Sequence, residues 1–301
     1  YGRLGAITDD TQMTMFTAEG AIRSVMRWLN RGICSPEMVI RHAYYRWLHT
    51  QGDRPARANT FPISYNKHVL SGWLIDIDEL HSARAPGGTC LEALKRCAPV
   101  VESKGCGGVM RVAPIGLLSA TRQFNGSPFE LGANAAKITH GHPTGYLAAG
   151  AMAEIIFRLT DSDVEIYDAC TDVIKLLESQ QGSAETISAL NAALNAAIHL
   201  GRDSSAIPSL GEGWVAEEAL AIGVYAAMIA DSFEDGIRIA VNHSGDSDST
   251  GSITGQILGT KLGVQAIPQR WLRNLELRTE IEQLASDLFS ISLRREGSDI
   301  G

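Results

Sequence analysis

The residues best suited to chemistry in this sequence are two aspartates, Asp246 and Asp248, which lie in a run rich in Gly and Ser, HSGDSDSTG at 243–251. Such a run is typical of a loop, in which side chains two positions apart point to the same side. Two carboxylates with neighbouring hydroxyls form an all-oxygen ligand set that suits Mg²⁺, Mn²⁺ or Ca²⁺ better than Zn²⁺. The competing interpretation is a solvated turn that caps the next helix.

An EF-hand calcium loop is an alternative, because Asp246, Asp248 and Thr250 match its first three ligand positions. That loop needs a bidentate Glu at its twelfth position. This chain has the apolar Ile257 there. We therefore reject an EF-hand.

A second acidic cluster, Thr8-Asp9-Asp10, lies far away in the sequence, at the start of a predicted helix. Carboxylates are ordinary residues at a helix N-terminus, so this cluster alone is weak evidence for a metal site. Asp9 and Gln12 also have the spacing of a capping box. Together with Asp246 and Asp248, Asp9 and Asp10 would supply four carboxylates, enough to neutralise two divalent cations. Spacing alone does not show that the two clusters meet.

The elements that must position these residues are predicted to be helices. Apolar residues recur at helical spacing over 15–29, 187–198 and 277–288, and Gly32 is placed to end the first of these helices. The pattern also predicts helices over 164–178, 217–230 and 232–241. Surface loops are predicted over 51–59 and 200–213. Alternating β-branched strands are nearly absent, so the predicted class is all-α.

Four glycines recur at every fourth position after the second aspartate pair: Gly251, Gly255, Gly259 and Gly263. Glycine destabilises a helix, so a line of glycines on one face indicates close approach of a neighbouring helix. The five tryptophans are predicted to pack in the core.

Composition narrows the class of protein. Of 301 residues, 45% are hydrophobic and 20% are charged, which is typical of a globular protein. The net charge of −8 argues against non-specific binding to nucleic acid or to an anionic membrane. The five cysteines are dispersed and form no C-x-x-C pair, which favours reduced thiols in the cytosol. No apolar run has the roughly 20 residues needed to span a bilayer. We expect a cytoplasmic monomer.

Five sequence blocks, in order, resemble the ADP-ribosylglycohydrolase family. They are GRLGAITDDTQMTMFTAEG near the start, SKGCGGVMRVAPIG at 103–116, THGHPTGYLAAG at 139–150, GWVAEEALAIGVYAAM at 213–228 and HSGDSDSTGSITGQILG at 243–259. The resemblance implies a single-domain orthogonal helical bundle over residues 1–301, with two Mg²⁺ or Mn²⁺ ions in a central cleft. It also implies hydrolysis of the glycosidic bond between ADP-ribose and an acceptor.

The expected partner is therefore an ADP-ribosylated protein or a small ADP-ribose conjugate, with the acceptor linkage left open. The alternative is a non-catalytic relative that binds ADP-ribose or is structural, like the crystallin-like members of the family. Four converging carboxylates argue against that alternative, because their repulsion is costly without metal.

Carried over position by position, the resemblance implies a set of site residues. The metal ligands are Thr8, Asp9, Asp10, Asp246, Asp248 and Ser249, of which Asp9 and Asp248 are also the catalytic candidates. The substrate-binding residues are Ser103, Lys104, Gly105, Gly107 and Gly108, in a glycine-rich loop facing the pyrophosphate, and His140. The family usually has Thr where this chain has Ser249, so a slightly looser site is expected.

Two further features of the sequence differ from the family pattern. Cys106 in the glycine-rich loop is a nucleophile by residue type, but the resemblance gives it no role. The family also carries a helix with a GDALG-like sequence and an acidic residue before its first block. We expect that helix to lie upstream of Tyr1, because losing it would leave an apolar gap in the core.

Overall fold

A computed structural model describes residues 1–56, 69–118, 127–203 and 205–292. Within these ranges every regular element is a helix, and only two isolated β-bridges occur, so the all-α prediction is confirmed. The longer helices are α1 (Asp9–Arg31), α2 (Pro36–Thr50), α3 (Gly88–Arg96), α5 (Pro128–Lys137), α6 (Pro143–Leu159), α7 (Ile166–Glu178), α8 (Ala184–His199), α10 (Ala216–Ile229), α11 (Phe233–Val241), α12 (Ser247–Leu262) and α14 (Arg278–Ser292). The short ones are η3 (Trp73–Asp76), η4 (Asp78–Leu80), η5 (Cys106–Gly108), α4 (Ala113–Leu117), α9 (Ala206–Leu210), η7 (Val264–Ala266) and α13 (Gln269–Leu272).

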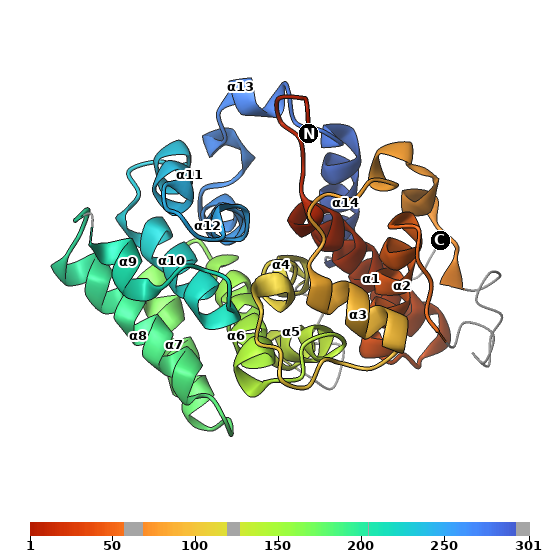
Figure 1. Cartoon of the computed structure of the whole chain (residues 1–301), viewed down its shortest axis with the longest axis horizontal. Helices are drawn as coiled ribbons and strands as arrows, with labels where there is room; N and C mark the ends of the chain where they lie inside the picture. Colours follow the sequence, from red (N-terminus) through yellow and green to blue (C-terminus); the bar gives the residue numbers. More distant parts are fainter. Residues whose placement is uncertain (57–68, 119–126, 204, 293–301) are drawn as a thin grey trace.

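Helices α6 and α10 lie at the centre of this arrangement. Both are apolar around most of their circumference, as expected of helices buried on all sides. Helix α6 packs on α4, α5 and α7, whereas α10 packs on α8, α11 and α12. Helices α1, α2 and α14 form one end of the molecule and α7–α9 the other (Figure 1). One contiguous apolar core contains residues of helices from α1 to α14.

Helix α1 begins and ends close to where the sequence indicates. Gly32 adopts the left-handed conformation (φ 66°) just after its last residue, as predicted. The predicted capping box is wrong, because Thr8 is the residue before the helix and Gln12 turns inward. The Gln12 side chain is buried, where its amide donates to Ser82 O and its oxygen accepts from Trp47 Nε1. These tertiary contacts replace the local capping bond.

A buried glutamate from the far end of the chain holds the segment that leads into α1. Glu276 is 2% exposed, and its carboxylate accepts from the backbone N of Ile7 at 3.0 Å and from Arg84 at 2.9 Å. Its own backbone N donates to Gly5 O at 2.9 Å. The N-terminal segment therefore lies beside the turn that links α13 to α14 (Figure 1).

The glycine line of α12 consists of Gly251, Gly255 and Gly259 and faces α11, as the predicted close packing requires. The fourth predicted member, Gly263, lies beyond the last residue of the helix. A methyl group added at Gly251 would lie 2.7 Å from Cγ1 of Val241, which is too close for a carbon contact. The same methyl at Gly255 would lie 3.3 Å from Ile237, and at Gly259 it would lie 3.9 Å from Phe233. The two helices therefore approach most closely near the start of α12.

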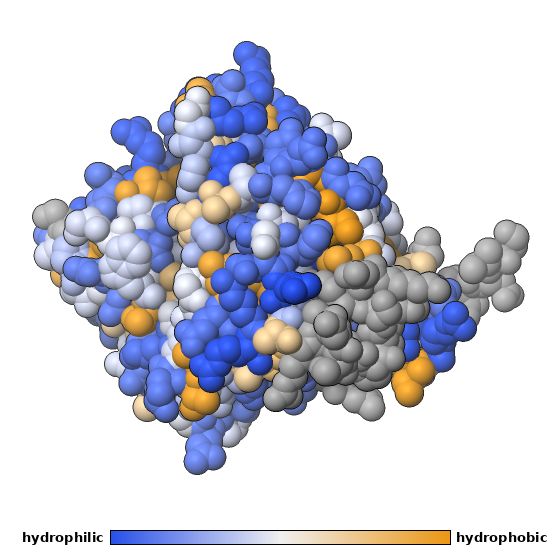
Figure 2. All heavy atoms as spheres, turned by 45° about the vertical axis from the view of Figure 1, so that its right-hand side comes forward, coloured by the Kyte–Doolittle hydropathy of each residue, from blue (hydrophilic) through white to orange (hydrophobic). Residues whose placement is uncertain are grey.

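Two predictions about the surface are wrong. The predicted loop 200–213 contains the short helix α9, whose Ala206 and Leu210 are buried in the core. Trp214 and Trp73 are 57% and 40% exposed, although tryptophans were expected inside. Elsewhere hydrophilic residues predominate on the face in Figure 2, and apolar ones form short patches.

In the part of the chain described here, no helix has both the length and the apolar character needed to cross a bilayer.

The glycine line yields a matched pair of substitutions on one helix. We expect Gly251→Ala to destabilise the protein by about 1–3 kcal/mol, because the added methyl overpacks against a β-branched side chain. Gly259→Ala should instead stabilise it by up to about 1 kcal/mol, since the methyl fits and alanine has the higher helix propensity. Urea unfolding measures both, and equal effects of the two substitutions would contradict this packing.

Candidate metal centre

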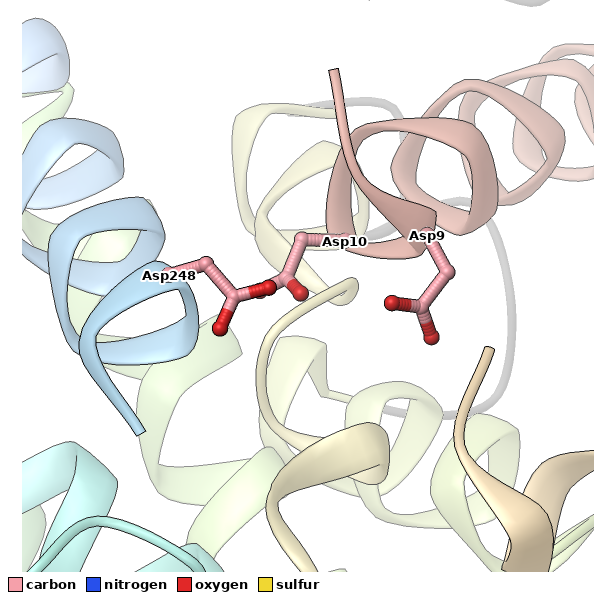
Figure 3. A group of neighbouring side chains, drawn as sticks. All are labelled: Asp9, Asp10 and Asp248. Carbon is pink, nitrogen blue, oxygen red and sulfur yellow. The ribbon is translucent and has the colours of Figure 1, made fainter. Parts of the chain in front are cut away.

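Three carboxylates from opposite ends of the chain converge at one place. Asp9 and Asp10 are the first two residues of α1, and Asp248 is the second residue of α12. One carboxylate oxygen from each lies within 4.8 Å of the others, and the three side chains point toward one another (Figure 3). Asp9 and Asp10 are buried, whereas Asp248 is exposed. We call these three residues the acidic cluster.

The N-termini of two helices bring the acidic cluster together. Thr8 precedes α1, and its hydroxyl lies 3.4 Å from Asp10 Oδ2. Asp246 precedes α12 and caps it by accepting from the backbone N of Ser249. The positive ends of two helix dipoles therefore face the carboxylates and offset part of their repulsion.

The prediction that Asp246 and Asp248 both lie in a loop is wrong in part. Only Asp246 lies outside the helix, and Asp248 belongs to the first turn of α12. The argument from side chains two apart in a loop therefore does not apply. Asp246 directs one oxygen to its capping bond and the other, Oδ2, to the thiol of Cys106 at 2.8 Å, while Asp248 points to the acidic cluster.

Burial and mutual repulsion make these carboxylates costly to ionise. Burial, countered by a hydrogen bond from the backbone N of Gly87 and increased by the charge of Asp248, raises the pKa of Asp9 to about 6. Burial first, and then the charges of Asp248 and Asp9, raise the pKa of Asp10 well above its usual range. Burial and Asp248 also raise the pKa of Asp246 to about 6. An acidic group that is neutral near pH 6 is poised for proton transfer or for a cation.

The acidic cluster fits a hard divalent cation. Its donors are all carboxylate oxygens, which Mg²⁺, Mn²⁺ and Ca²⁺ prefer. Among the described residues, no Lys or Arg forms an ion pair with Asp9, Asp10, Asp246 or Asp248. Asp10 Oδ1 is buried and has no hydrogen-bond partner. A buried oxygen in this state needs a compensating ligand.

The glycine-rich loop, residues 103–108, lies against the start of α12. It is fixed through main-chain atoms to the segment 211–216: Trp214 O accepts from the backbone N of Cys106, and Lys104 O accepts from that of Ala216. Glu212 O, in the same segment, accepts from the backbone N of Asp246. Residues 211–216 thus connect the glycine-rich loop to the acidic end of α12.

Lys104 is held by ion pairs, and His140 is buried. The Lys104 ammonium bonds two carboxylates, Glu217 at 2.6 Å and Glu185 at 2.7 Å. His140 is 1% exposed beneath the loop, and burial with the nearby charge of Arg111 lowers its pKa to about 3, so the imidazole is neutral.

The glycines of this loop leave room for what lies beneath it. A methyl at Gly107 would lie 2.9 Å from Cys90 Sγ and 3.3 Å from the ring of His140, and a methyl at Gly108 would lie 3.4 Å from the same ring. Gly105 forms the bridge to Val215, and its backbone N lies 3.4 Å from the hydroxyl of Ser103. A methyl at Gly108 would also lie 3.1 Å from Cβ of Ala136, so packing under the loop disfavours a side chain at both positions, most strongly at Gly107.

Sequence reasoning missed three contributors to this site. Gly87 supplies a backbone donor to Asp9, and Glu276 fixes the approach to α1. Neither stands near a recognisable motif, so no sequence signal identifies them. Trp214 presents an exposed ring next to the glycine-rich loop, and its GW pair within the fourth sequence block was the available signal.

Comparison with known proteins places the chain among enzymes of ADP-ribose chemistry. A family model described as ADP-ribosylglycohydrolase matches residues 1–297. An uncharacterized protein of Archaeoglobus fulgidus is 28% identical over 300 residues, which cover 98% of this chain and 84% of that protein. The ADP-ribosyl-[dinitrogen reductase] glycohydrolase of Rhodospirillum rubrum is 26% identical over 206 residues, covering 65% of this chain and 62% of that relative. A solved structure described as an ADP-ribosylglycohydrolase-related protein complex superposes with a TM-score of 0.61 at 25% identity, covering 96% of this chain and 83% of that one.

The raised pKa of Asp9 predicts how stability depends on pH when a chelator removes divalent cations. Its pKa is 3.8 ordinarily and about 6 in the folded chain, so the folded state binds the proton more tightly. The contribution of Asp9 to stability is therefore present at low pH and lost as the pH rises through about 6. Asp9→Asn should stabilise the chelated protein at pH 7.5 by up to about 3 kcal/mol, and this gain should largely vanish near pH 4. Urea unfolding at the two pH values measures the difference, with the exposed Asp168→Asn as control; a gain independent of pH would contradict the assignment.

The contacts of Lys104 predict a structural cost for its removal. Lys104→Met leaves Glu217, which is 7% exposed, without its cationic partner, so we expect a loss of about 2 kcal/mol. Glu185→Gln removes only the exposed half of the pair and should cost less than about 1 kcal/mol. Adding Glu217→Gln to Lys104→Met should recover most of the loss. Thermal unfolding tests all three, and a neutral Lys104→Met would show that the pair is not structural.

Proposed function

The chain belongs to the ADP-ribosylglycohydrolase family, and we propose that it is a metal-dependent hydrolase of the glycosidic bond between ADP-ribose and an acceptor. The observation that carries the proposal is the acidic cluster, in which two buried carboxylates of α1 and an exposed one of α12 meet without an ion-paired Lys or Arg among the described residues. A protein with only a structural role has no need of this arrangement, because its repulsion and desolvation destabilise the fold.

We propose two Mg²⁺ or Mn²⁺ ions as the cofactor, held by Asp9, Asp10 and Asp248, with Thr8, Asp246 and Ser249 completing the set. The positions of these six residues at the starts of α1 and α12 support this assignment. Bound there, the cations would bind ribose hydroxyls and lower the pKa of water.

The chain's own residues then have separate roles. Asp248 is the exposed member of the acidic cluster, which suits a group that takes a proton from the attacking water. Asp9 and Asp10, buried behind it, place negative charge where the anomeric carbon becomes positive in an oxocarbenium-like transition state. Asp9 has a pKa of about 6 and is the second candidate for proton transfer.

The pyrophosphate is proposed to lie at the glycine-rich loop. Lys104 is occupied by two carboxylates, so its charge is largely neutralised locally. The backbone N–H of Gly107, at the opening of the short helix η5, is proposed to bind an anion there. The exposed ring of Trp214 offers a stacking surface next to this loop.

The test is a panel of ADP-ribose conjugates linked through arginine, serine and O-acetyl groups, incubated with the protein and Mg²⁺. We expect release of ADP-ribose from at least one linkage and its loss with chelator. Asp248→Asn should lower the rate by about 100-fold or more, as expected for loss of a proton-transfer group, while the fold persists because Asp248 is exposed.

Thermal unfolding in the same buffers separates cation binding from turnover. Mg²⁺ at 100 times its dissociation constant should stabilise the protein by about 2.7 kcal/mol. The exposed Asp168→Asn should match the parent protein in both measurements. Cation-dependent stabilisation and ADP-ribose binding without release from any linkage would identify a non-catalytic ADP-ribose-binding relative instead.

A further inference from the structure

A buried arginine near the glycine-rich loop has no acidic partner. Arg111 is 0% exposed, and among the described residues it forms no ion pair with Asp or Glu. Its guanidinium lies 4.2 Å from the centre of the Tyr44 ring and donates to the sulfur of Cys90 at 3.2 Å. Burial raises the pKa of Cys90, so this thiol is neutral and does not cancel the charge. Because an unpaired buried charge is costly, an anion near Arg111 would stabilise the protein.

A short chain of hydrogen bonds connects this cation to His140. Arg111 Nη2 donates to Thr139 Oγ1 at 2.7 Å, and Thr139 Oγ1 lies 2.8 Å from His140 Nδ1. The Thr139 hydroxyl has one proton, for which His140 Nδ1 and Ala136 O, at 3.3 Å, compete. Ala136 O already accepts from the backbone N of Thr139 and that of His140, so both of its lone pairs are used. The hydroxyl proton therefore goes to Nδ1.

This hydrogen bond fixes the tautomer of His140. The imidazole is neutral, because burial and the charge of Arg111 lower its pKa to about 3. A neutral ring that accepts at Nδ1 carries its proton on Nε2. Nε2 faces the glycine-rich loop, since methyl groups added at Gly105 and Gly107 would lie 3.6 and 3.5 Å from it. No acceptor in the described part of the chain bonds Nε2, although His140 is 1% exposed, so a buried donor lacks a partner here.

The positive charge available to an anion at this loop comes from beneath it. Lys104, the cation of the loop itself, is held by Glu185 and Glu217. Arg111 has no such partner, and its full burial keeps solvent from screening its charge. A cation at the far end of a hydrogen-bond chain also polarises that chain, which makes the Nε2–H of His140 a stronger donor.

We propose that Arg111 and Thr139 are positioning residues that hold His140 as its Nε2–H tautomer, and that this N–H donates to the pyrophosphate of the ADP-ribose conjugate. The identity of the anion rests on the proposed function. The charge of Arg111 attracts the pyrophosphate from below the loop, which a protein with a net charge of −8 needs for an anionic substrate. No proton is transferred on binding, because His140 is neutral before and after.

Nitrogen-15 NMR of histidine-labelled protein reads the tautomer without a substitution at either positioning residue. We expect His140 Nδ1 to have the shift of a nitrogen without a proton and Nε2 that of an N–H. ADP-ribose should move the Nε2–H proton resonance downfield, because that proton gains an acceptor. Loss of these signals in His140→Gln identifies them. A proton on Nδ1, or an Nε2–H resonance that bound ADP-ribose leaves unmoved, would overturn the proposal.

Replacing Thr139 tests the chain of hydrogen bonds itself. Thr139→Val keeps the shape of the side chain, and we expect it to bind ADP-ribose about tenfold more weakly, as for loss of a hydrogen bond to a charged group. Its His140 should show both tautomers by NMR. Thr139→Ser, which restores the hydroxyl, should bind as the unmodified chain does.

The matched control is Thr171→Val on α7, where the hydroxyl donates to Tyr167 O at 2.9 Å, outside the loop and the acidic cluster. Calorimetric titration with ADP-ribose compares the variants, and equal affinity of Thr139→Val and the unmodified chain would refute the role of Thr139. If Thr139→Val does not fold, the NMR measurement on the unmodified chain decides.

Turnover separates this inference from the proposed function. A chain that releases ADP-ribose but carries its His140 proton on Nδ1 would refute the positioning role and leave the hydrolase standing. The expected tautomer and the ADP-ribose-dependent shift in a chain that releases ADP-ribose from no conjugate would refute the hydrolase and leave the positioning role standing.

Discussion

The acidic cluster depends on holding three carboxylates, which repel one another when ionised, close together in the protein. Asp9, Asp10 and Asp248 place oxygens within 4.8 Å of one another, two of them away from solvent, with no described cationic side chain paired to them. Such an arrangement persists only when the surrounding structure holds it. Helix dipoles offset part of the repulsion, the backbone N of Gly87 donates to the Asp9 carboxylate, and the Glu276 carboxylate accepts from the backbone N of Ile7 just before it. The remaining charge is what a cation would compensate.

The fold explains why residues so far apart in sequence can share one site. Glu276, close to α14, holds the backbone that enters α1, so the C-terminal part of the chain positions its N-terminal carboxylates. Close packing of α12 on α11, through the glycine line, then fixes the direction in which Asp248 points. The cluster is therefore a product of tertiary packing at both of its helices.

Much of the helical architecture follows from sequence periodicity alone. The stripe over 15–29 and the terminating Gly32 predict α1 almost to the residue, because apolar spacing and a left-handed glycine act locally. The glycine line likewise indicated a packed face. A local rule failed where tertiary contacts compete with it, because Gln12 leaves its capping position for a buried bond to Trp47. Asp248 belongs to the first turn of α12 rather than to a loop, whereas Asp246 caps that helix, as the competing interpretation expected. That the two acidic segments meet came only from family resemblance, because spacing along a chain carries no information about distance in space.

The link between the glycine-rich loop and α12 is made by main-chain atoms of residues 211–216, and the indole of Trp214 takes no part in it. The main chain of residues 211–216 thus holds the glycine-rich loop in place, while the Trp214 side chain of the same segment stays exposed. A substitution at 214 would therefore change the exposed surface beside the glycine-rich loop and leave the main-chain link between this loop and α12 in place.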